Sequence, residues 1–549
     1  MVDTEAPDVL VVGAGPVGLT TAAELSRRGV SCRIVDKLPA GLPYAKAVGI
    51  QPRTLEIWDR MGLVRSVLDA AVPMRGQLVY INGVEQTRID LALPPDVPYG
   101  FAALPQYETE RILEQFLAGL GTRIERGREL VSFTQDGNGV TCALVDSTGV
   151  QKEVRARYLV GCDGAHSVVR KSLGLTFDGG AFPEEYMLAD VEVDWDLPAG
   201  YGVRAMHRAG DRTIDDLLVC IPLPGAGRYR MSMLVPPELS AAHEQQNGTP
   251  QDGVAHGLEG GRVPVLADIQ TVLDRLSPRP TTASALRWSS VFRISHRLVN
   301  RYGGGRVFVA GDAAHIHPPT GAQGMNTGIQ DAYNLAWKLA LVLSDGAGTG
   351  LLASYDTERR PIGEEVVART VRHAAEGVQA DPTDPQTLLL REAQLLIDYR
   401  SSPLVGRPDP TAGDGPQPGD RAPDCAGLTR DIAAYPVRLH ELLRDREHLL
   451  LWYENRPGGV SDELTEFLAV AEELSAARLE TCLVLAPAVP ERLGVGPPVY
   501  RDGAGEFARI YGVGGPTVLV VRPDGHLGAR LSPPSTSELT AYLKGVFQR

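Results

Sequence analysis

Three glycines near the start of the chain have a spacing that suits the binding of a phosphate group. They occur in the run Gly13-Ala14-Gly15-Pro16-Val17-Gly18, between an apolar stretch at 8–12 and a helical pattern at 16–28. Gly13 would permit a tight turn, Gly15 would let the backbone approach a pyrophosphate, and Gly18 would let the helix pack closely on the strand. Free N–H groups and the dipole at the start of that helix favour an anion. The run predicts a dinucleotide site whose contacts include Gly13, Gly15, Pro16, Val17 and Gly18.

An acidic residue ends the next predicted strand, SCRIVD at 31–36. This residue, Asp36, follows Gly18 by 18 residues, and its carboxylate is placed to accept hydrogen bonds from a ribose diol. The glycine run alone is weak evidence. A strand, a helix and Asp36 in register favour a dinucleotide-binding unit over a purely structural turn. The pattern leaves open whether the dinucleotide is NAD or FAD.

Two later segments favour FAD. The segment GCDGAHSVVRKSLG at 161–174 begins where a predicted strand ends, and it contains Asp163. The segment at 305–340 repeats the order of strand, Gly311-Asp312, loop and helix. Asp312 would stand at the carboxyl end of a strand, where open α/β sheets bind ligands, and a carboxylate there suits the hydroxyls of a ribityl chain. The run from Gly321 to Asn326 opens the helix and can direct backbone N–H groups at a flavin ring.

These three segments, in this order and spacing, resemble the single-component (class A) flavoprotein aromatic hydroxylases of the p-hydroxybenzoate hydroxylase type. The resemblance covers residues 8 to about 345. Within that family the chain is similar to the phenol hydroxylase and aromatic-polyketide hydroxylase branch, which carries a thioredoxin-like C-terminal domain. Lys46 stands where the family usually has an arginine near the FAD pyrophosphate; lysine keeps the charge but loses the bidentate fork. The resemblance implies FAD contacts at Asp36, Lys37, Lys46, Gln106, Val131, Asp163, Gly311, Asp312, Pro318, Gly321, Gly324, Met325 and Asn326, with Pro319 beside the ring.

The resemblance also implies a reaction. FAD would be the bound cofactor, and NADPH or NADH would bind transiently to reduce it, which agrees with the lack of a second GxGxxG motif in the sequence. Reduced flavin and O2 would form a C4a-hydroperoxide that transfers one oxygen atom to an electron-rich carbon of a phenolic or polycyclic, polyketide-type substrate. The protein would orient the substrate and exclude water. The same chemistry can oxidise a ketone in a Baeyer–Villiger reaction, and the sequence does not separate the two outcomes.

We expect the substrate to lie between the flavin and a sheet predicted at 187–235. No serine, histidine or carboxylate constellation in the sequence stands out as an obligatory base, so the catalytic residue is left unassigned. Tyr229 is a candidate to hydrogen-bond or deprotonate a phenol, and Arg53 or Arg293 to hold a phenolate or carboxylate. Each of them has an alternative interpretation as a core or scaffold residue. The candidates to line the substrate are Ile50, Phe101, Tyr229, Met231, Trp288, Phe292 and Pro319.

The elements that must position these residues predict an α/β protein in several parts. A Rossmann-type FAD-binding domain is predicted at 1–182, and it resumes, with a helical segment, at 294–400. Between these parts, alternating strands at 183–293 predict an inserted antiparallel-sheet domain for the substrate. Residues 401–424 are rich in Pro, Gly and Asp and predict a linker. Residues 425–549 show a βαβ-like alternation, and the resemblance makes them a thioredoxin-like α/β domain that lacks a CxxC pair.

Length and composition are those of an ordinary globular protein. The chain has 549 residues, of which 43% are hydrophobic and 22% charged, with a net charge of −14. That charge argues against a general nucleic-acid binder, which would show a basic footprint. No apolar run reaches the ~18 residues of a membrane span, and the acidic start lacks the basic region of a signal peptide, so we expect a cytoplasmic protein without membrane contact. The expected partners are a small aromatic substrate and O2, with the chain as a monomer or homodimer.

Other interpretations of single residues are weaker. His315 and His317 with Asp312 suggest a metal site, but histidines two apart on an extended segment would point to opposite sides, and no third ligand has suitable spacing, so no metal is expected. Cys425 and Cys482 suggest a redox function. That function needs a CxxC pair or an activated thiolate, and because the sequence has no CxxC pair, no redox function is expected. The competing functions are a flavin-dependent dehydrogenase or oxidase, which inserts no oxygen, and a non-catalytic flavoprotein that binds an aromatic ligand.

Overall fold

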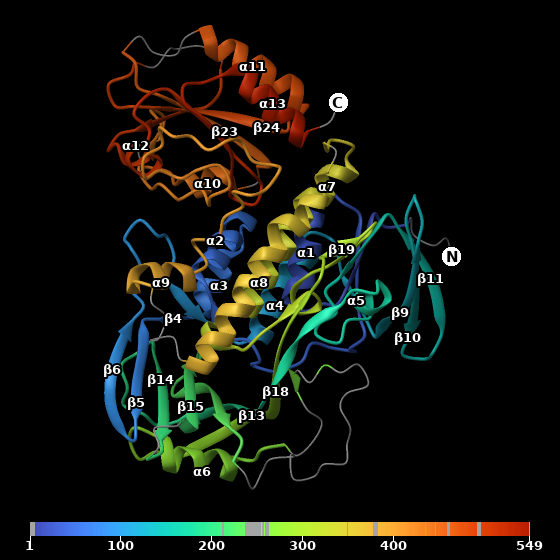
Figure 1. The fold of residues 1–549 in the computed structure, drawn as a ribbon, viewed down its shortest axis with the longest axis vertical. Coiled ribbons are helices and arrows are strands. Elements are labelled where there is room, and N and C mark those ends of the chain that lie inside the picture. The colour runs from blue at the N-terminus through green and yellow to red at the C-terminus, as the bar shows by residue number, and fades with distance from the viewer. Residues whose placement is uncertain are drawn as a thin grey trace.

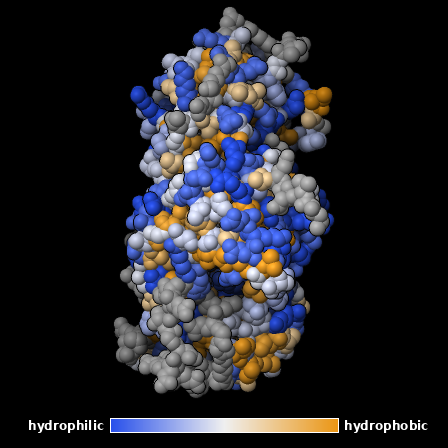
Figure 2. Space-filling model, turned by 90° about the vertical axis from the view of Figure 1, so that its right-hand side faces the viewer, coloured by the Kyte–Doolittle hydropathy of each residue, from blue (hydrophilic) through white to orange (hydrophobic). Residues whose placement is uncertain are grey.

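The computed structural model describes residues 6–210, 214–236, 254, 257–258, 263–348, 350–376, 383–433, 435–444, 446–457, 462–490 and 496–547. Three parts follow one another along the long axis of the molecule (Figure 1): a large sheet at the lower end, an α/β unit in the middle, and a C-terminal α/β unit at the upper end. The face shown in Figure 2 has more hydrophilic than hydrophobic surface. Within the described ranges, no helix has the length and apolar character needed to cross a membrane.

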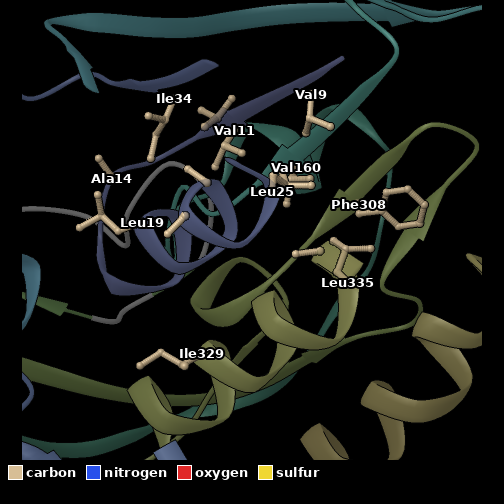
Figure 3. Packing of buried hydrophobic residues seen from close by; sticks show 14 of the residues in the cluster. Val9, Val11, Ala14, Leu19, Leu25, Ile34, Val160, Phe308, Ile329 and Leu335 are labelled. Carbon is tan, nitrogen blue, oxygen red and sulfur yellow. The ribbon is translucent and has the colours of Figure 1, made fainter. Parts of the chain in front are cut away.

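The middle unit has a mostly parallel sheet covered by helices. Its strands are β1 (Val9–Val12), β2 (Cys32–Asp36), β8 (Ile124–Arg126), β12 (Tyr158–Gly161), β19 (Gly303–Gly304) and β20 (Val307–Val309), in the order β19-β20-β12-β1-β2-β8. Its main helices are α1 (Pro16–Arg27), α4 (Gln106–Gly119) and α7 (Gly324–Leu343). Strand and helix side chains share one apolar core, as Figure 3 shows for Val9, Leu19, Ile34, Val160 and Leu335. Strands β2, β1, β12 and β20 run parallel, so their carboxyl ends lie at one edge of the sheet.

The sheet at the lower end is assembled from three separate stretches of chain. Its strands are β5 (Gly76–Ile81), β6 (Val84–Asp90), β13 (Phe177–Val193), β14 (Tyr201–Arg208), β15 (Ile214–Pro222), β16 (Arg228–Leu234), β17 (Gly257–Leu258), β18 (Ala283–Val299) and β21 (His315–Ile316), with helix α6 (Leu266–Leu276) on one face. The order β17-β18-β13-β16-β15-β14-β5-β6 is antiparallel except for the β14–β5 pair. Strands β5 and β6 lie outside the predicted range 183–293, so this sheet is more than an insertion at that range.

Smaller elements complete the middle unit. One three-stranded sheet contains β9 (Arg128–Gln135), β10 (Val140–Asp146) and β11 (Gln151–Ala156), and another contains β3 (Gly49–Ile50), β4 (Val72–Met74) and β7 (Phe101–Ala103). The further helices are α2 (Pro52–Met61), α3 (Val64–Ala70), α5 (Val168–Ser172), α8 (Ala353–Glu376) and α9 (Pro385–Glu392), and the 3-10 turns are η3 (Gly311–Ala313) and η4 (Thr320–Ala322). Strand β3 places residues 49 and 50 next to η4, close to the start of α7.

The C-terminal unit has a six-stranded sheet with apolar residues on both faces. Its elements are β22 (Leu428–Thr429), α10 (Leu439–Leu443), β23 (His448–Glu454), α11 (Asp462–Ser475), β24 (Leu479–Leu485), β25 (Val499–Asp502), α12 (Glu506–Tyr511), β26 (Thr517–Val521), β27 (Leu527–Leu531) and α13 (Thr536–Val546). The strand order is β22-β25-β24-β23-β26-β27. Trp452 of β23 packs into one apolar cluster and Tyr453 into the other, which explains why this strand is an unbroken apolar run in the sequence.

The segment predicted as a linker, 401–424, is packed between the middle and C-terminal units. Within it, the structure shows no helix or strand. Asp409 is nevertheless 6% exposed, and its Oδ2 accepts a hydrogen bond from Arg530 Nε at 2.7 Å. Asp424 is 3% exposed and is paired with Arg438. These two contacts fix the segment to the C-terminal unit, and Arg421 Nη1 within it lies 2.9 Å from Glu56 Oε1 of α2 in the middle unit.

Candidate active site

The glycine run forms a tight turn between β1 and α1. Gly13 has a φ of +99°, and a Cβ there would overlap the carbonyl oxygen of Cys162. A Cβ on Gly18 would overlap the carbonyl oxygen of Gly13, so α1 approaches β1 this closely only with glycine at this position. A Cβ on Gly15, in contrast, would meet no atom within 4 Å. Helix α1 has Gly15 as its N-cap, Pro16 as its first residue and no side-chain cap, so its N-terminus is open to a ligand.

Asp36 ends β2 beside this turn. Its Oδ2 accepts a hydrogen bond from the backbone N of Ala14 (2.7 Å), and its Oδ1 accepts one from the backbone N of Leu38 (2.8 Å). The carboxylate therefore fixes the turn, while each oxygen keeps a second lone pair for a further donor. That arrangement is compatible with a ribose diol held next to the turn. Lys37, the next residue, is exposed.

Asp163 follows β12 at the same edge of the sheet. Its Oδ1 accepts a hydrogen bond from Ser167 Oγ (2.6 Å), and its Oδ2 accepts from the backbone N atoms of Val168 (2.7 Å) and Val169 (3.1 Å). These donors stand at the start of α5, so Asp163 satisfies backbone groups that a helix N-terminus leaves unpaired. Burial raises the pKa of Asp163, although these hydrogen bonds favour the charged form. Asp163 is thus a positioning residue that shapes the loop behind Gly13.

Gly311 and Asp312 follow β20 and meet the glycine run from the other side. Gly311 has a φ of +62°, and a Cβ there would come 2.8 Å from Val17 Cγ2. The backbone N of Gly311 donates to Asp331 Oδ2 on α7 at 3.1 Å. The Asp312 side chain is 38% exposed at the edge of the sheet. The first and third motifs of the sequence are therefore brought into direct contact through Val17.

Lys46 connects this edge with the large sheet. Its Nζ lies 3.8 Å from Asp312 Oδ2 and 5.9 Å from the centroid of the Phe292 ring on β18. The Lys46 side chain is 36% exposed, so the ion pair by itself contributes little to stability. The contacts of Lys46 show that Asp312, a predicted cofactor residue, and Phe292, a predicted substrate residue, lie close to the same amine.

Asn326 ties the loop before α7 to strand β3 and helix α2. Its Oδ1 accepts hydrogen bonds from the backbone N of Gln51 (3.0 Å) and from Thr54 Oγ1 (2.8 Å). Its Nδ2 donates to the carbonyl oxygens of Gly49 (3.0 Å) and Ala322 (2.7 Å). These four bonds use both donors and both principal lone pairs of the amide. A contact of Asn326 with a flavin would therefore be made by its backbone, because its side-chain amide is occupied.

The rest of this loop is held through its backbone. Gly321 has a φ of +72°, and a Cβ there would overlap a carboxylate oxygen of Glu392. Gln51 Nε2 donates to the carbonyl oxygen of Gly321 at 2.6 Å. Gln51 is a site residue that the sequence analysis missed, because it follows a two-residue strand that has no periodic signal. The other predicted residues of this region, Pro318, Pro319, Gly324 and Met325, lie in the same loop or in the first turn of α7.

Gln106 and Val131 lie on different elements. Gln106 is the first residue of α4; its Oε1 accepts a hydrogen bond from the backbone N of Ala47 (3.1 Å), and its Nε2 donates to Glu110 Oε1 (2.8 Å). Gln106 therefore fixes the backbone next to Lys46. Val131 lies on β9 with its side chain facing solvent, 43% exposed.

The two histidines of the loop lie side by side, contrary to the expectation that they point to opposite sides. Their ring centroids are 6.2 Å apart, and the ring planes differ by 12°. His315 Nε2 lies 2.8 Å from Asp331 Oδ2, and His317 Nδ1 lies 3.0 Å from the carbonyl oxygen of Pro318. The alternation rule fails here because β21 ends at residue 316. In the part of the chain that the structure describes, no three His, Cys, Asp or Glu side chains are grouped to hold a metal ion.

The two faces of the large sheet separate the predicted substrate residues. Trp288 and Phe292 lie on the face toward the middle unit, where the Trp288 ring stacks on Tyr44 with centroids 5.1 Å apart. Tyr229 and Met231 belong to the apolar cluster formed with α6 on the opposite face. Successive residues of a strand alternate between faces, so these two side chains point away from Phe292. Tyr229 and Met231 are thus packed as core residues, and their contact with a substrate stays a prediction.

Both predicted arginines have partners within the protein. Arg53 is 2% exposed; its Nη1 lies 2.9 Å from Glu56 Oε2, and its Nη2 donates to the carbonyl oxygen of Asp524 in the C-terminal unit at 2.7 Å. Arg293 Nη2 lies 2.7 Å from Glu185 Oε1. Both guanidinium groups thus have acidic partners, and their role in holding a substrate anion stays a prediction. Of the remaining candidates, Ile50 is buried in the core of the middle unit, and Phe101 packs against Ala393 and Leu395.

The edge of the parallel sheet fits FAD. The open space at Gly15 and the uncapped N-terminus of α1 suit a pyrophosphate. Asp36 and Asp312 stand at the ends of two different strands of that edge, where they can hold a ribose and a ribityl chain respectively. The loop at 318–326 supplies backbone rather than side-chain groups for the ring.

Replacing Asp312 with alanine should weaken FAD binding about 10- to 100-fold, because a carboxylate hydrogen bond to the cofactor is worth ~1.5–3 kcal/mol. The measurement is the ratio of flavin to protein absorbance after gel filtration, together with a fluorescence titration with FAD. Asp69→Ala is the matched control, since Asp69 is 75% exposed in a surface ion pair of the same unit. An Asp312→Ala protein that retains FAD as fully as the control would contradict the assignment of Asp312.

Comparison with known proteins agrees with this geometry. The family model described as "FAD binding domain" matches residues 6–370. The chain is 33% identical to 6-methylpretetramide 4-monooxygenase of Streptomyces rimosus over 99% of this chain and 94% of the relative. It is 30% identical to pentachlorophenol 4-monooxygenase of Sphingobium chlorophenolicum over 95% of this chain and 93% of the relative.

A crystal structure of similar fold contains the cofactor. The ternary complex of aklavinone-11 hydroxylase with FAD and aklavinone matches with a TM-score of 0.75 and 27% identity, over 99% of this chain and 99% of that chain. The family match, the full-length relatives and the FAD-compatible edge of the sheet lead to one conclusion. The chain belongs to the class A FAD-dependent aromatic hydroxylases.

Proposed function

We propose that the protein is an FAD- and NAD(P)H-dependent monooxygenase that inserts one oxygen atom from O2 into a phenolic or polycyclic aromatic substrate. The observation that carries the proposal is the position of Lys46, whose amine lies 3.8 Å from Asp312 and 5.9 Å from the Phe292 ring. The edge of the parallel sheet that fits FAD thus lies next to the aromatic face of the large sheet. A ring bound on that face would lie next to the flavin.

Bound FAD would supply the activation of O2 after its reduction by NAD(P)H. The residues of this chain have two tasks around it. Asp36, Asp312 and the N-terminus of α1 hold the cofactor. Trp288, Phe292 and Tyr44 offer an aromatic surface that orients a ring and excludes water from the reaction.

We propose a polycyclic substrate of the polyketide type, and hence a role in tailoring such a compound. Support comes from relatives whose names specify 6-methylpretetramide and aklavinone. It also comes from strands β13 and β18, which have 17 residues each and give the sheet an extended face. A single-ring phenol would cover only a small part of that face.

We propose that the substrate provides its own activation through an ionised hydroxyl. The candidate catalytic residues support this by their positions: Tyr229 packs on the far face of the sheet, and Arg53 and Arg293 are paired with acids. An ionised hydroxyl makes the ring carbons ortho and para to it electron-rich, which is what electrophilic oxygen transfer requires.

We propose that residues 425–549 form a thioredoxin-like unit with a structural role. The order β24-β23-β26-β27, with β23 and β24 parallel and β26 and β27 antiparallel to their neighbours, supports that fold. Burial raises the pKa of Cys425 to about 12 and that of Cys482 to about 11. A thiol with a raised pKa is not a nucleophile at neutral pH.

Cys425→Ser should therefore leave substrate turnover per bound flavin unchanged within about twofold, because no thiolate is present to remove. Steady-state oxidation of NADPH in the presence of substrate measures this. Cys425→Ala is the companion variant, since it separates any cost of burying a hydroxyl from a loss of sulfur chemistry. A fall of tenfold or more in both variants would indicate redox work by this unit.

The proposed function is tested by NADPH consumption and O2 uptake with the flavin-loaded protein. A panel of phenols, naphthols and polycyclic quinones is added one compound at a time. Stimulation of both rates, with a product one oxygen atom heavier, is the expected result. Flavin reduction by an added compound in the absence of NADPH would instead indicate a dehydrogenase or oxidase. A response of neither kind to any aromatic compound would favour a binding protein.

A further inference from the structure

One turn of the C-terminal unit contacts the two helices that hold the loop at 318–326, called the flavin loop below. The turn consists of residues 522–526 and connects β26 to β27. Asp524, in the middle of this turn, is only 2% exposed. All the predicted FAD contacts lie before residue 327, so an effect of the C-terminal unit on the cofactor would have to pass through elements of the middle unit.

The carboxylate of Asp524 binds α7. Its Oδ2 accepts hydrogen bonds from Trp337 Nε1 at 3.1 Å and from Asn334 Nδ2 at 3.2 Å. Asn326, which ties the flavin loop to β3 and α2, lies on the same helix about two turns, or ~12 Å, before Asn334. A continuous helix is a rigid element over such a distance, so Asp524 fixes the helix from which the flavin loop emerges.

The backbone carbonyl of Asp524 binds α2. Arg53 Nη2 donates a hydrogen bond to this carbonyl oxygen at 2.7 Å. Thr54, the next residue of α2, donates from its Oγ1 to Asn326 Oδ1 at 2.8 Å. The first turn of α2 therefore contacts the C-terminal unit through one residue and the flavin loop through the next.

The turn fits closely against α2 and holds Asp524 in its charged form. Gly525 has a φ of +80°, and a Cβ there would come 2.5 Å from Arg60 Nη1 of α2. Burial alone would raise the pKa of Asp524, but Arg522, whose Nη2 lies 2.5 Å from Asp524 Oδ2, brings that pKa well below its ordinary value. An ionised carboxylate only accepts hydrogen bonds, which suits the donors on α7.

We propose that Asp524 is a positioning residue for the flavin loop, through which the C-terminal unit determines where the flavin ring is held. The carboxylate fixes α7 and the carbonyl oxygen fixes α2, so the loop that both helices contact keeps one position. The C-terminal unit thereby contributes to cofactor binding without touching the cofactor. This inference rests on the proposed function, because it takes the loop at 318–326 as the border of the flavin.

The test compares two replacements of Asp524. Asp524→Ala removes the acceptor for α7 and should raise the dissociation constant of FAD about 3- to 30-fold. Asp524→Asn should raise it less than about threefold, because an amide oxygen can still accept from Trp337 and Asn334. Fluorescence titration of the flavin-free protein with FAD gives the constants, and the visible circular dichroism of the bound flavin should change only in Asp524→Ala. An effect of Asp524→Asn as large as that of Asp524→Ala would contradict the positioning role.

Arg530→Met is the matched control. Arg530 lies on β27 of the same unit, is 4% exposed and pairs with Asp409. Both Arg530→Met and Asp524→Ala should lower the unfolding midpoint of the flavin-free protein, because each breaks a buried ion pair. Arg530→Met should change the FAD dissociation constant less than about twofold, since Arg530 has no contact with α2 or α7 among its hydrogen bonds. An equal rise in both variants would overturn the positioning role, because general destabilisation would explain it.

Trp337→Phe is the second variant if Asp524→Ala does not fold. It removes one donor to Asp524 but keeps an aromatic ring in the core, and it should raise the FAD dissociation constant about 2- to 10-fold. Trp452→Phe is its control, because the Trp452 ring packs on Phe467 within the C-terminal unit, with centroids 5.1 Å apart. If both tryptophan variants bind FAD as the wild-type protein does, the link through α7 is wrong.

A double-variant cycle shows whether Asp524 acts through the flavin loop. Asn326→Ala releases the loop from α2 and should by itself raise the FAD dissociation constant. Effects of independent sites more than ~10 Å apart usually add. If Asp524 acts through the loop, adding Asp524→Ala to Asn326→Ala should raise the constant less than about twofold further. Full addition of the two effects would overturn the inference.

The outcomes distinguish this inference from the proposed function. If aromatic compounds are oxygenated but Asp524→Ala binds FAD as Arg530→Met does, the positioning role is wrong and the monooxygenase assignment stands. If FAD binding depends on Asp524 and Asn326 but no compound is oxygenated, the positioning role is supported and the proposed function fails.

Discussion

Replacing Arg522 with alanine should lower the free energy of unfolding by about 3–5 kcal/mol, because it removes one partner from a buried ion network. Arg522 joins the C-terminal unit to α8: its Nη1 and Nη2 each lie 2.8 Å from a carboxylate oxygen of Glu358, and its Nη2 lies 2.5 Å from Asp524 Oδ2. All three side chains are 3% exposed or less. Without the guanidinium, two buried carboxylates would be left near a single cation, Lys338, whose Nζ lies 2.6 Å from Glu358 Oε2.

The network also predicts that the free energy of unfolding falls in acid. Burial alone would raise the pKa of Glu358, but Arg522 and Lys338 bring it well below its ordinary value. A carboxyl whose pKa is lowered by folding stabilises the fold at neutral pH, and that contribution is lost as the pH falls below the unfolded value of ~4.3. The wild-type protein should therefore lose stability in acid by more than Arg522→Ala does.

The measurement is denaturation by urea, followed by tryptophan fluorescence. Arg400→Ala is the control, because Arg400 is 60% exposed and its pair with Asp420 lies at the surface, so its loss should cost less than ~1 kcal/mol. If Arg522→Ala unfolds within about 1 kcal/mol of Arg400→Ala, the network does not hold the two units together as proposed here.

Alanine at Gly18 and alanine at Gly15 should both abolish FAD retention, but only the first should destabilise the protein. A Cβ at Gly18 would overlap the carbonyl oxygen of Gly13, so α1 must move off β1. Overpacking of this kind costs about 1–3 kcal/mol or more. A Cβ at Gly15 meets no protein atom within 4 Å, so it should obstruct only the pyrophosphate.

Two measurements on the same variants test this difference: flavin content after gel filtration and the unfolding midpoint of the flavin-free protein. Each variant should lose at least about 100-fold in FAD affinity, the equivalent of ~3 kcal/mol. Gly119→Ala, at the end of α4 with no atom within 4 Å of an added Cβ, should alter neither quantity. A yellow, flavin-loaded Gly15→Ala protein would contradict the placement of the pyrophosphate.

Local motifs predicted the ends of these strands because each motif is continuous in the sequence. The turn after β1, Asp36 at the end of β2 and Asp312 after β20 all stand at the predicted ends of strands. Contacts between segments that are distant in the sequence could not be predicted in this way. Asn326 and Gln51 are 275 residues apart in the sequence and form a hydrogen bond. No periodic pattern predicts such a contact.

The substrate sheet was predicted less completely, for two physical reasons. Strands β5 and β6 form a hairpin around Asn82 and Gly83, which have φ values of 51° and 76°. The Asn-Gly turn signal for this hairpin is present in the sequence, but it lies about 100 residues before the predicted sheet. The period of two in β16 identifies two faces but does not say which face meets the flavin. The packing of α6 places Tyr229 on the face of the sheet that is turned away from Phe292, which the sequence pattern alone does not reveal.

The fate of the two oxygen atoms of O2 shows most directly whether the protein is a monooxygenase. The FAD-loaded protein is supplied with NADPH, 18O2 and the aromatic compound that most stimulates O2 uptake, and the product is analysed by mass spectrometry. We expect one 18O atom in a ring hydroxyl of the product, with one NADPH consumed per product. A product oxidised without 18O, or O2 converted only to hydrogen peroxide with every compound that stimulates O2 uptake, would contradict the proposed reaction.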